Sequence, residues 1–139
     1  NLIDGDFKGT SLRGLYLYNT NIGNIEPLNE LLPEYLRNLN LGQNNLGHIP
    51  PAKFHAIVKR FPRLTNLYVQ NSDLLTISDL RQTNVTFLWV DRNPFICDCR
   101  ISWLKTFSYR NPAQCGNPVE LQGKIIEEVG IEDLCPGES

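Results

Sequence analysis

One pattern of apolar residues recurs along the chain and constrains its fold more than any other feature. Residues 36–46 read L-x-x-L-x-L-x-x-N-x-L, where x stands for any residue. Windows that begin at residues 12, 64 and 85 fit the same frame. Four successive copies predict structural units that stack on one another, because a fixed period is the signature of repeat architectures. Positions 1, 4, 6, 9 and 11 of the other three frames hold Leu12, Leu15, Leu17, Thr20 and Ile22; Leu64, Leu67, Val69, Ser72 and Leu74; and Val85, Leu88, Val90, Asn93 and Phe95.

Each frame predicts a short β-strand that ends in a turn. Side chains alternate between the two faces of a strand, so positions 4 and 6 point into the core and position 5 points outward. We therefore expect parallel neighbouring strands near residues 15–17, 39–41, 67–69 and 88–90. Position 9 requires a short side chain that bonds to nearby backbone, and Asn44 and Asn93 provide one. The hydroxyls of Thr20 and Ser72 bond more weakly and predict looser turns.

The longest repeat, which begins at Leu36, has room for a helix. Pro51 suits the first turn of a helix. The apolar residues that follow it recur at the spacing of one helical face, and they are Phe54, Ile57, Val58 and Phe61. The shortest repeat leaves room only for a turn around residues 78–82.

All four cysteines lie in the last third of the chain. Clustered cysteines in an even number are typical of a disulfide framework, whereas a zinc site favours pairs spaced by two to four residues. Cys97 and Cys99 are separated by a single residue, and neither Cys115 nor Cys135 has a close partner. The spacing therefore favours disulfides, and disulfides indicate an oxidising compartment. Spacing alone leaves three ways of pairing the cysteines open.

A run of residues after the fourth frame completes a resemblance to a known family. Residues 93–104 read N-P-F-I-C-D-C-R-I-S-W-L. With the four frames before it, this run resembles the end of extracellular leucine-rich-repeat proteins that carry a cysteine-rich C-terminal flanking cap. The resemblance covers nearly the whole chain. Toll-like receptors, Slit-type guidance ligands and neuronal adhesion receptors share this ending.

The resemblance implies an α/β fold: a right-handed leucine-rich-repeat solenoid with a parallel β-sheet on its concave face. It implies repeats over residues 1–92 and a disulfide-bonded cap over residues 93–139. The bridges that it implies are Cys97–Cys115 and Cys99–Cys135. A cap is needed because the last repeat of a solenoid otherwise exposes its stacking face. The residues expected in the core of the cap are Trp103, Leu104 and Phe107.

The front of the chain differs from its end. Residues 1–10 resemble the tail of a preceding repeat, with Leu2, Ile3 and Phe7 as apolar residues, and no cysteine cap precedes them. Either further repeats lie upstream in the parent protein, or these residues form a minimal cap. An apolar end that stays open favours self-association.

The outward positions of the frames identify a candidate binding site. Parallel strands would bring the position-5 residues into one row. Tyr, Trp and Arg are over-represented at binding hot spots because they bury a large area and keep a polar group. Aromatics also pair across strands for structural reasons, which is the alternative interpretation. The candidate ligand-binding residues are Tyr16, Tyr18, Arg37, Asn40, Tyr68, Gln70, Phe87, Trp89 and Arg92.

Charge distinguishes the outward positions from the rest of the chain. They hold Arg13, Arg37 and Arg92 against Asp91, while the whole chain has a formal net charge of −2. A mildly basic face on an acidic body favours an acidic partner. The charge is too small to predict a nucleic-acid or heparin partner.

Asn84 begins the only N-x-S/T sequon of the chain, which fits a secreted glycoprotein. It lies just before the fourth predicted strand. A glycan there would restrict one lip of the concave face and leave the rest open.

Other functional classes find little support in the sequence. It contains no Gly-rich phosphate loop, no Ser-His-Asp set that the repeats bring together and no paired histidines. We therefore expect neither an enzyme nor a bound cofactor or metal ion. No apolar run approaches the roughly 20 residues that cross a bilayer, so this segment is not expected to insert into a membrane.

The sequence predicts an extracellular protein-binding module, the C-terminal part of a signalling receptor or secreted ectodomain. Its partner would be a protein ligand or co-receptor on the concave face. The alternative is a structural module that caps or dimerises a longer ectodomain.

Overall fold

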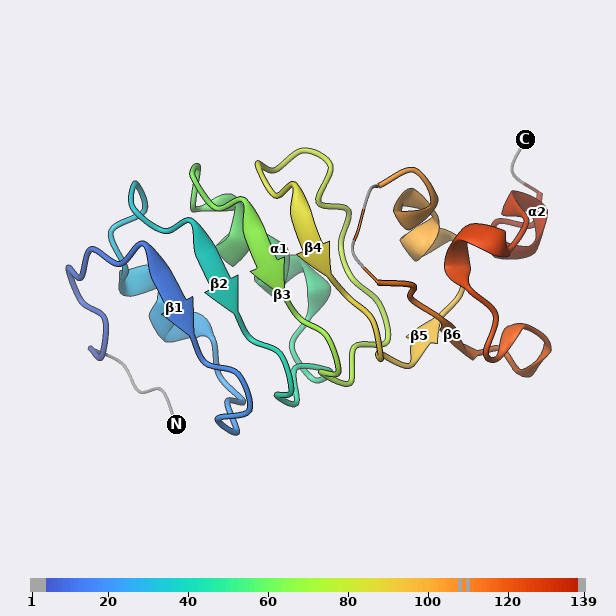
Figure 1. The fold of residues 1–139 in the computed structure, drawn as a ribbon, viewed down its shortest axis with the longest axis horizontal. Coiled ribbons are helices and arrows are strands. Elements are labelled where there is room, and N and C mark those ends of the chain that lie inside the picture. Colours follow the sequence, from blue (N-terminus) through green and yellow to red (C-terminus); the bar gives the residue numbers. More distant parts are fainter. Residues whose placement is uncertain (1–4, 108, 110, 138–139) are drawn as a thin grey trace.

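The computed structural model describes residues 5–107, 109 and 111–137. Its main sheet consists of strands β1 (Gly14–Tyr16), β2 (Asn38–Asn40), β3 (Asn66–Tyr68) and β4 (Phe87–Trp89), which are parallel and lie side by side in chain order (Figure 1). Parallel pairing of successive frames confirms the sequence prediction. Each strand begins one residue earlier than predicted, because the interstrand bonds already start at position 2 of the frame. There, the Arg13 carbonyl oxygen accepts from the N–H groups of Arg37 and Asn38.

Equivalent frame positions stack into continuous rows inside the molecule. Burying a Leu or Val side chain contributes on the order of 1.5–3 kcal/mol, so these rows are a main source of stability. The row at position 4 is aligned by the strand register and buried; it contains Leu15, Leu39, Leu67 and Leu88. The row at position 6 is completely buried in three of the four frames, by Leu41, Val69 and Val90.

Asn44 holds the turns of two repeats at once. From Nδ2 it donates to the carbonyl oxygens of Leu17 and Leu41, at 2.9 Å each. Its Oδ1 accepts from the backbone N–H groups of Thr20 and Ile22, at 3.2 and 2.8 Å. The turn at Thr20 is therefore fixed by the asparagine of the next repeat.

Asn93, in the fourth repeat, makes the equivalent bonds to the turn of the third repeat. It donates to the carbonyl oxygens of Val69 and Val90 and accepts from the N–H groups of Ser72 and Leu74. Asn93 is buried, so these bonds are shielded from water. The prediction of looser turns at the two repeats without asparagine is wrong, because the following repeat supplies the missing amide.

Helical segments cover one face of the sheet (Figure 1). Helix α1 (Pro51–Lys59) begins at Pro51, as predicted, and it contacts the 3₁₀ helix η1 (Glu26–Glu30) of the preceding repeat. Residues 78–82 contain only a turn, also as predicted. The predicted apolar face of the helix is buried and comprises Phe54, Ile57, Val58 and Phe61.

Residues 95–137 form a second region, here called the C-terminal segment. Its two strands, β5 (Phe95–Ile96) and β6 (Cys115–Asn117), pair in parallel. Disulfides join Cys97 to Cys115 and Cys99 to Cys135, the pairing that the resemblance implies. The remaining elements are short helices: η2 (Cys99–Lys105), η3 (Val119–Leu121), η4 (Ile126–Glu128) and α2 (Ile131–Leu134).

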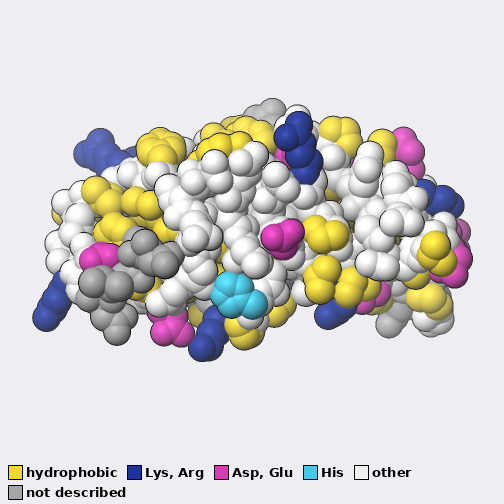
Figure 2. Space-filling model, turned by 90° about the horizontal axis from the view of Figure 1, so that it is seen from below, with side chains coloured by type: hydrophobic (Ala, Val, Ile, Leu, Met, Phe, Trp, Pro, Cys, Tyr) yellow, Lys and Arg dark blue, Asp and Glu magenta, His cyan; other side chains and the backbone are white. Residues whose placement is uncertain are grey.

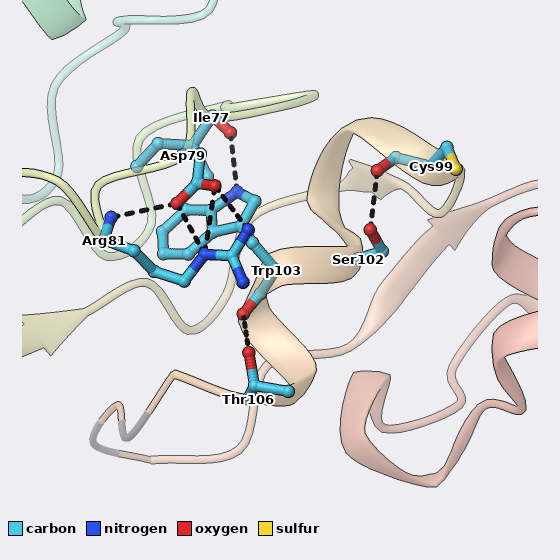
Figure 3. A network of polar contacts seen from close by, with 7 residues as sticks. All are labelled: Ile77, Asp79, Arg81, Cys99, Ser102, Trp103 and Thr106. Carbon is cyan, nitrogen blue, oxygen red and sulfur yellow. Dashed lines mark hydrogen bonds and ion pairs between the residues drawn. The ribbon is translucent and has the colours of Figure 1, made fainter.

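Trp103 in η2 attaches the C-terminal segment to the third repeat (Figure 3). Its Nε1 donates to the carbonyl oxygen of Ile77 at 3.2 Å, and Phe107 meets its ring edge-on with centroids 5.3 Å apart. A backbone bond from Ile96 N to Leu75 O, at 2.8 Å, adds a second attachment. The predicted core residues of this region are buried or half-buried, and they are Trp103, Leu104 and Phe107.

The β1 end of the sheet is more open. Within the described part of the chain, β1 has β2 as its only strand neighbour. Phe7, Leu12 and Leu17 are half-buried there, and hydrophobic side chains gather at this end of the molecule (Figure 2). Leu2 and Ile3, which the sequence also predicts as apolar contacts, lie outside the described residues.

Candidate functional site

The sheet register brings the four position-5 residues into one row on the face opposite α1, here called the outer sheet face. Tyr16 aligns with Asn40, Asn40 with Tyr68, and Tyr68 with Trp89. Adjacent strands lie about 4.8 Å apart, so residues distant in the sequence form one patch. Tyr16 is 66% exposed, and the other three are half-buried.

Tyr68 and Trp89 form a single aromatic platform. Their ring centroids are 4.0 Å apart and their planes differ by 11°. Such pairs contribute about 0.5–1.5 kcal/mol beyond area burial, so the stack orients both rings before any partner arrives. Mutual coverage of one ring face also explains why these large side chains are only half-exposed.

Two glycines make room for side chains of the outer sheet face. A Cβ atom added at Gly14 would lie 2.9 Å from the ring of Tyr16, and one added at Gly42 would lie 2.9 Å from the side-chain amide of Gln70. Both side chains therefore lie against a glycine, where a Cβ atom would crowd them. Asn40 also turns toward the backbone, where its Oδ1 accepts from Gly42 N at 3.0 Å. This bond uses the side-chain oxygen of Asn40, so Asn40 is less available to a ligand than its outward frame position predicts.

Tyr18 and Phe87 flank the position-5 row, one on each side along the strands. They are 44% and 39% exposed, so they enlarge the aromatic surface.

Gln70 and Asp91 lie side by side in the row at position 7. Each follows by two residues a member of the aligned pair Tyr68 and Trp89. Gln70 Oε1 and Asp91 Oδ1 are buried and have no hydrogen-bond partner among the described residues. Buried acceptors normally have a partner, so water is expected to bond to them.

Arg92 lies at the end of β4, beside a cavity of about 530 Å³ that the C-terminal segment helps to line. Its side chain is 75% exposed and contacts Asp91 only loosely, with 3.9 Å between Nε and Oδ2. Asn111 and Gln114 line the same cavity. The cavity is therefore lined mainly by polar residues, and Arg92 is accessible at it.

Arg37 lies at the opposite edge of the outer sheet face, where the strands begin. It lines a pocket of about 220 Å³ together with Arg13, Glu34, Tyr35 and Arg63. Sequence reasoning included Arg13 and Arg37 among the outward positions but missed Arg63, Glu34 and Tyr35. The signal available for Arg63 was its position two residues before Thr65, which occupies frame position 2.

Asn84 is exposed, as is Thr86 of the same sequon. Asn84 Nδ2 donates to the carbonyl oxygen of Pro62 at 2.6 Å. The sequon therefore lies at the edge where the strands begin, next to the preceding repeat.

Titratable groups with shifted pKa values lie away from the outer sheet face. Hydrogen bonds from Arg81 lower the pKa of Asp79, and hydrogen bonds from Arg100 lower the pKa of Asp98 (Figure 3 shows the first pair). Asp98 also accepts from the N–H of Arg100 at the start of η2, which is a structural role. Burial raises the pKa of Tyr109.

Two further features concern the residues that the structure describes. No helix in those ranges reaches the length and hydropathy of a transmembrane span. No cluster of three or more potential metal ligands occurs among them.

No family model matches the sequence. The chain is similar to one from an octameric complex of Latrophilin 3 (Lec, Olf), Unc5D (Ig, Ig2, TSP1) and FLRT2 (LRR), with a TM-score of 0.60 and 23% identity over 73% of this chain and 33% of that one. It is also similar to human 5T4 (Wnt-activated inhibitory factor 1, trophoblast glycoprotein), with a TM-score of 0.47 and 20% identity over 73% of this chain and 47% of that one.

The first similarity supports a fold of the leucine-rich-repeat type. At this identity it concerns the fold alone. The chain spans about a third of the length of that neighbour.

Proposed function

We propose that this chain is the C-terminal part of an extracellular leucine-rich-repeat receptor or secreted protein, and that it binds a protein ligand or co-receptor. In this proposal residues 1–92 are repeats of a right-handed solenoid with the outer sheet face on its concave side. Residues 93–139 are the cysteine-rich cap. The ligand docks on the concave face, with Trp89, Tyr68 and Tyr16 as anchors.

One observation carries the proposal: the row of outward aromatics, in which Tyr68 and Trp89 are already stacked. Truncation of an aromatic anchor at an interface typically costs about 2 kcal/mol or more. A preformed stack reduces the entropy lost on binding, because its rings are ordered in the free protein. Exposed Tyr16 and Tyr18 extend the same surface toward β1.

Two features support an extracellular location. The two disulfides require an oxidising compartment to form and persist. The exposed sequon at Asn84 is accessible to glycosylation, and we include a glycan at this position in the proposal. In protein secreted from animal cells, an amidase that releases N-glycans should lower the mass by that of one N-glycan. The Asn84→Gln variant should show no such change.

The rival proposal is a module that only caps or dimerises a longer ectodomain. The half-buried Leu12 and Leu17 at the β1 end favour it, since they offer an apolar end face for another copy or another repeat. In that case the outer sheet face would have no ligand.

Alanine substitutions distinguish the two proposals. Protein ligands are first found by testing the wild-type chain against a panel of extracellular domains. Trp89→Ala and Tyr68→Ala should then weaken binding at least about tenfold, equivalent to about 1.4 kcal/mol. Val119→Ala is the matched control, because Val119 is a hydrophobic residue of the C-terminal segment with 74% exposure. Wild-type affinity in both aromatic variants, with unchanged melting temperatures, would exclude the outer sheet face as the site.

A further inference from the structure

The backbone brings two arginines together at the edge where β1 and β2 begin. Arg37 N and Asn38 N both donate to the carbonyl oxygen of Arg13, at 2.7 and 3.1 Å. Thr65 N and Asn66 N donate in the same way to the carbonyl oxygen of Arg37, at 3.1 Å each. Position 2 of the frame is therefore a row fixed by hydrogen bonds, with arginine in its first two places and threonine after them.

Arg63 joins this row from the end of the preceding convex connection. Its side chain lines the same pocket as Arg13 and Arg37, with Glu34 and Tyr35 completing the wall. We call these five residues the arginine pocket. Three arginines and one glutamate line the pocket, so it carries an excess of positive charge.

The side chains of these arginines are not used to hold the fold. Among the residues that the structure describes, no ion pair or side-chain hydrogen bond involves Arg13, Arg37, Arg63 or Glu34. Three other arginines show the contrast, since each has a structural partner. Arg81 pairs with Asp79, Arg100 pairs with Asp98, and Arg60 donates to the carbonyl oxygen of Leu31 at 2.6 Å.

Arg13, Arg37 and Arg63 are exposed, so their guanidinium groups are accessible to an anion. Guanidinium presents its N–H donors in a fork that matches the two oxygens of a carboxylate, and such charge-assisted bonds are about twice as strong as neutral ones. The pocket, of about 220 Å³, is large enough for one or two carboxylate groups. Tyr35 is 39% exposed and offers a hydroxyl and a ring at its rim.

The size and boundaries of the positive charge indicate which kind of anion fits. Neighbouring repeats are about 4.8 Å apart, so three of them span about 10 Å. Frame position 2 holds Thr65 and Thr86 in the next two repeats, so the row of arginines ends there, whereas a long polyanion requires a continuous basic track. A short acidic stretch of polypeptide matches both the extent and the charge of the pocket.

We infer that the arginine pocket binds the carboxylates of an acidic segment of a protein ligand. This inference rests on the proposed function and names the polar part of the same binding face. The acidic segment lies at the edge where the strands begin, while the apolar contacts of the ligand lie on the aromatic row.

The test uses a probe that does not require the natural ligand. A blocked tetrapeptide of alternating aspartate and glutamate is titrated into the disulfide-bonded protein, and the arginine Nε–Hε resonances are followed by NMR. Saturable shifts should be largest for Arg13, Arg37 and Arg63. The same peptide with asparagine and glutamine should give none.

Substitutions then locate the interaction. Arg37→Gln should weaken peptide binding about tenfold, as expected for loss of a charge-assisted contact. Lys59→Gln is the matched control, because it removes one positive charge from an exposed position on α1. Equal weakening in both variants, or larger shifts at Arg92 than at the pocket, would overturn the inference. Tighter binding of a heparin-derived tetrasaccharide than of the peptide would overturn it as well, by assigning the pocket to a sulfated glycan.

Failure of the inference can be distinguished from failure of the proposed function. Trp89→Ala should leave binding of the acidic peptide unchanged, since Trp89 does not line the arginine pocket. A protein ligand that depends on Trp89 but not on Arg37 would refute the inference and keep the proposed function. If the acidic peptide binds but binding of the protein ligand does not depend on Trp89, the inference is kept and the proposed function is refuted.

Discussion

The two ends of the sheet bury the same frame positions to different extents. At position 6, Val90 in the last frame is completely buried, whereas Leu17 in the first frame is half-buried. At position 1, Val85 is buried and Leu12 is half-buried. Since these residues are equivalent in the frame, their neighbours account for the difference. The C-terminal segment packs beyond β4, and no described strand lies beyond β1.

This contrast shows that periodic stacking and terminal cover are separate structural problems. An interior strand pairs in parallel with a strand on both sides, and one asparagine fixes two turns. The C-terminal segment has no period, and its 3₁₀ helices are only three to seven residues long. Helices of that length are not stable alone. Two disulfides and the contacts of Trp103 therefore hold the region that covers the β4 end.

Removal of a disulfide should lower the free energy of unfolding most, and it should affect the C-terminal segment before the repeats. Cys99 and Cys135 are separated by 36 residues, and closing a loop of that size contributes about 4 kcal/mol in the chain-entropy model. The double variant Cys99→Ser, Cys135→Ser should lose about this much unfolding free energy in urea. Hydrogen exchange should show residues 99–135 losing protection first, while β2 and β3 keep theirs. Simultaneous loss of protection in β2 would mean that both regions unfold as one unit.

Substitutions of turn side chains should change the free energy of unfolding less than loss of the disulfide, and by different amounts at the two ends of the sheet. Asn93→Ala removes four hydrogen bonds and leaves buried backbone groups of two turns without partners, so we expect a loss of about 3 kcal/mol. At the other end, Thr20 bonds through its hydroxyl only to the carbonyl oxygen of Leu17, and that site is exposed. Thr20→Ala should cost about 1 kcal/mol or less. Equal losses, measured by chemical unfolding, would contradict the unequal roles of the two turns.

The repeats were predictable from the sequence because their signals are local and periodic. The frame at residues 36–46 fixes which side chains face inward, and Pro51 with its apolar face marks the helix. Parallel order follows from repetition itself. The pairing of strands is thus contained in the spacing of a few leucines.

Other features depend on contacts that no spacing encodes. The stack of Tyr68 on Trp89 requires the ring orientations, and the arginine pocket requires Arg63 to approach from a connection outside the frames. The reach of Asn44 and Asn93 into the preceding repeat was missed for the same reason. Spacing also left the cysteine pairing open, and the resemblance was needed to choose among the alternatives.

Self-association through the β1 end should be the smallest of the effects. Phe7, Leu12 and Leu17 form an apolar end that two copies can bury against each other, and we propose a weak dimer on this basis.

Leu17→Gln should weaken that dimer about tenfold, or about 1.4 kcal/mol, because it removes apolar area from the contact. Leu75→Gln is the matched control, since Leu75 is an exposed leucine in the third repeat, far along the chain from β1. Sedimentation equilibrium over a wide concentration range measures both variants and the wild type. If the wild-type chain stays monomeric throughout, the result favours the alternative that residues 1–10 form a minimal cap. The contrast between the two ends would then concern the degree of burial only, since a few half-buried side chains can remain in water without driving association.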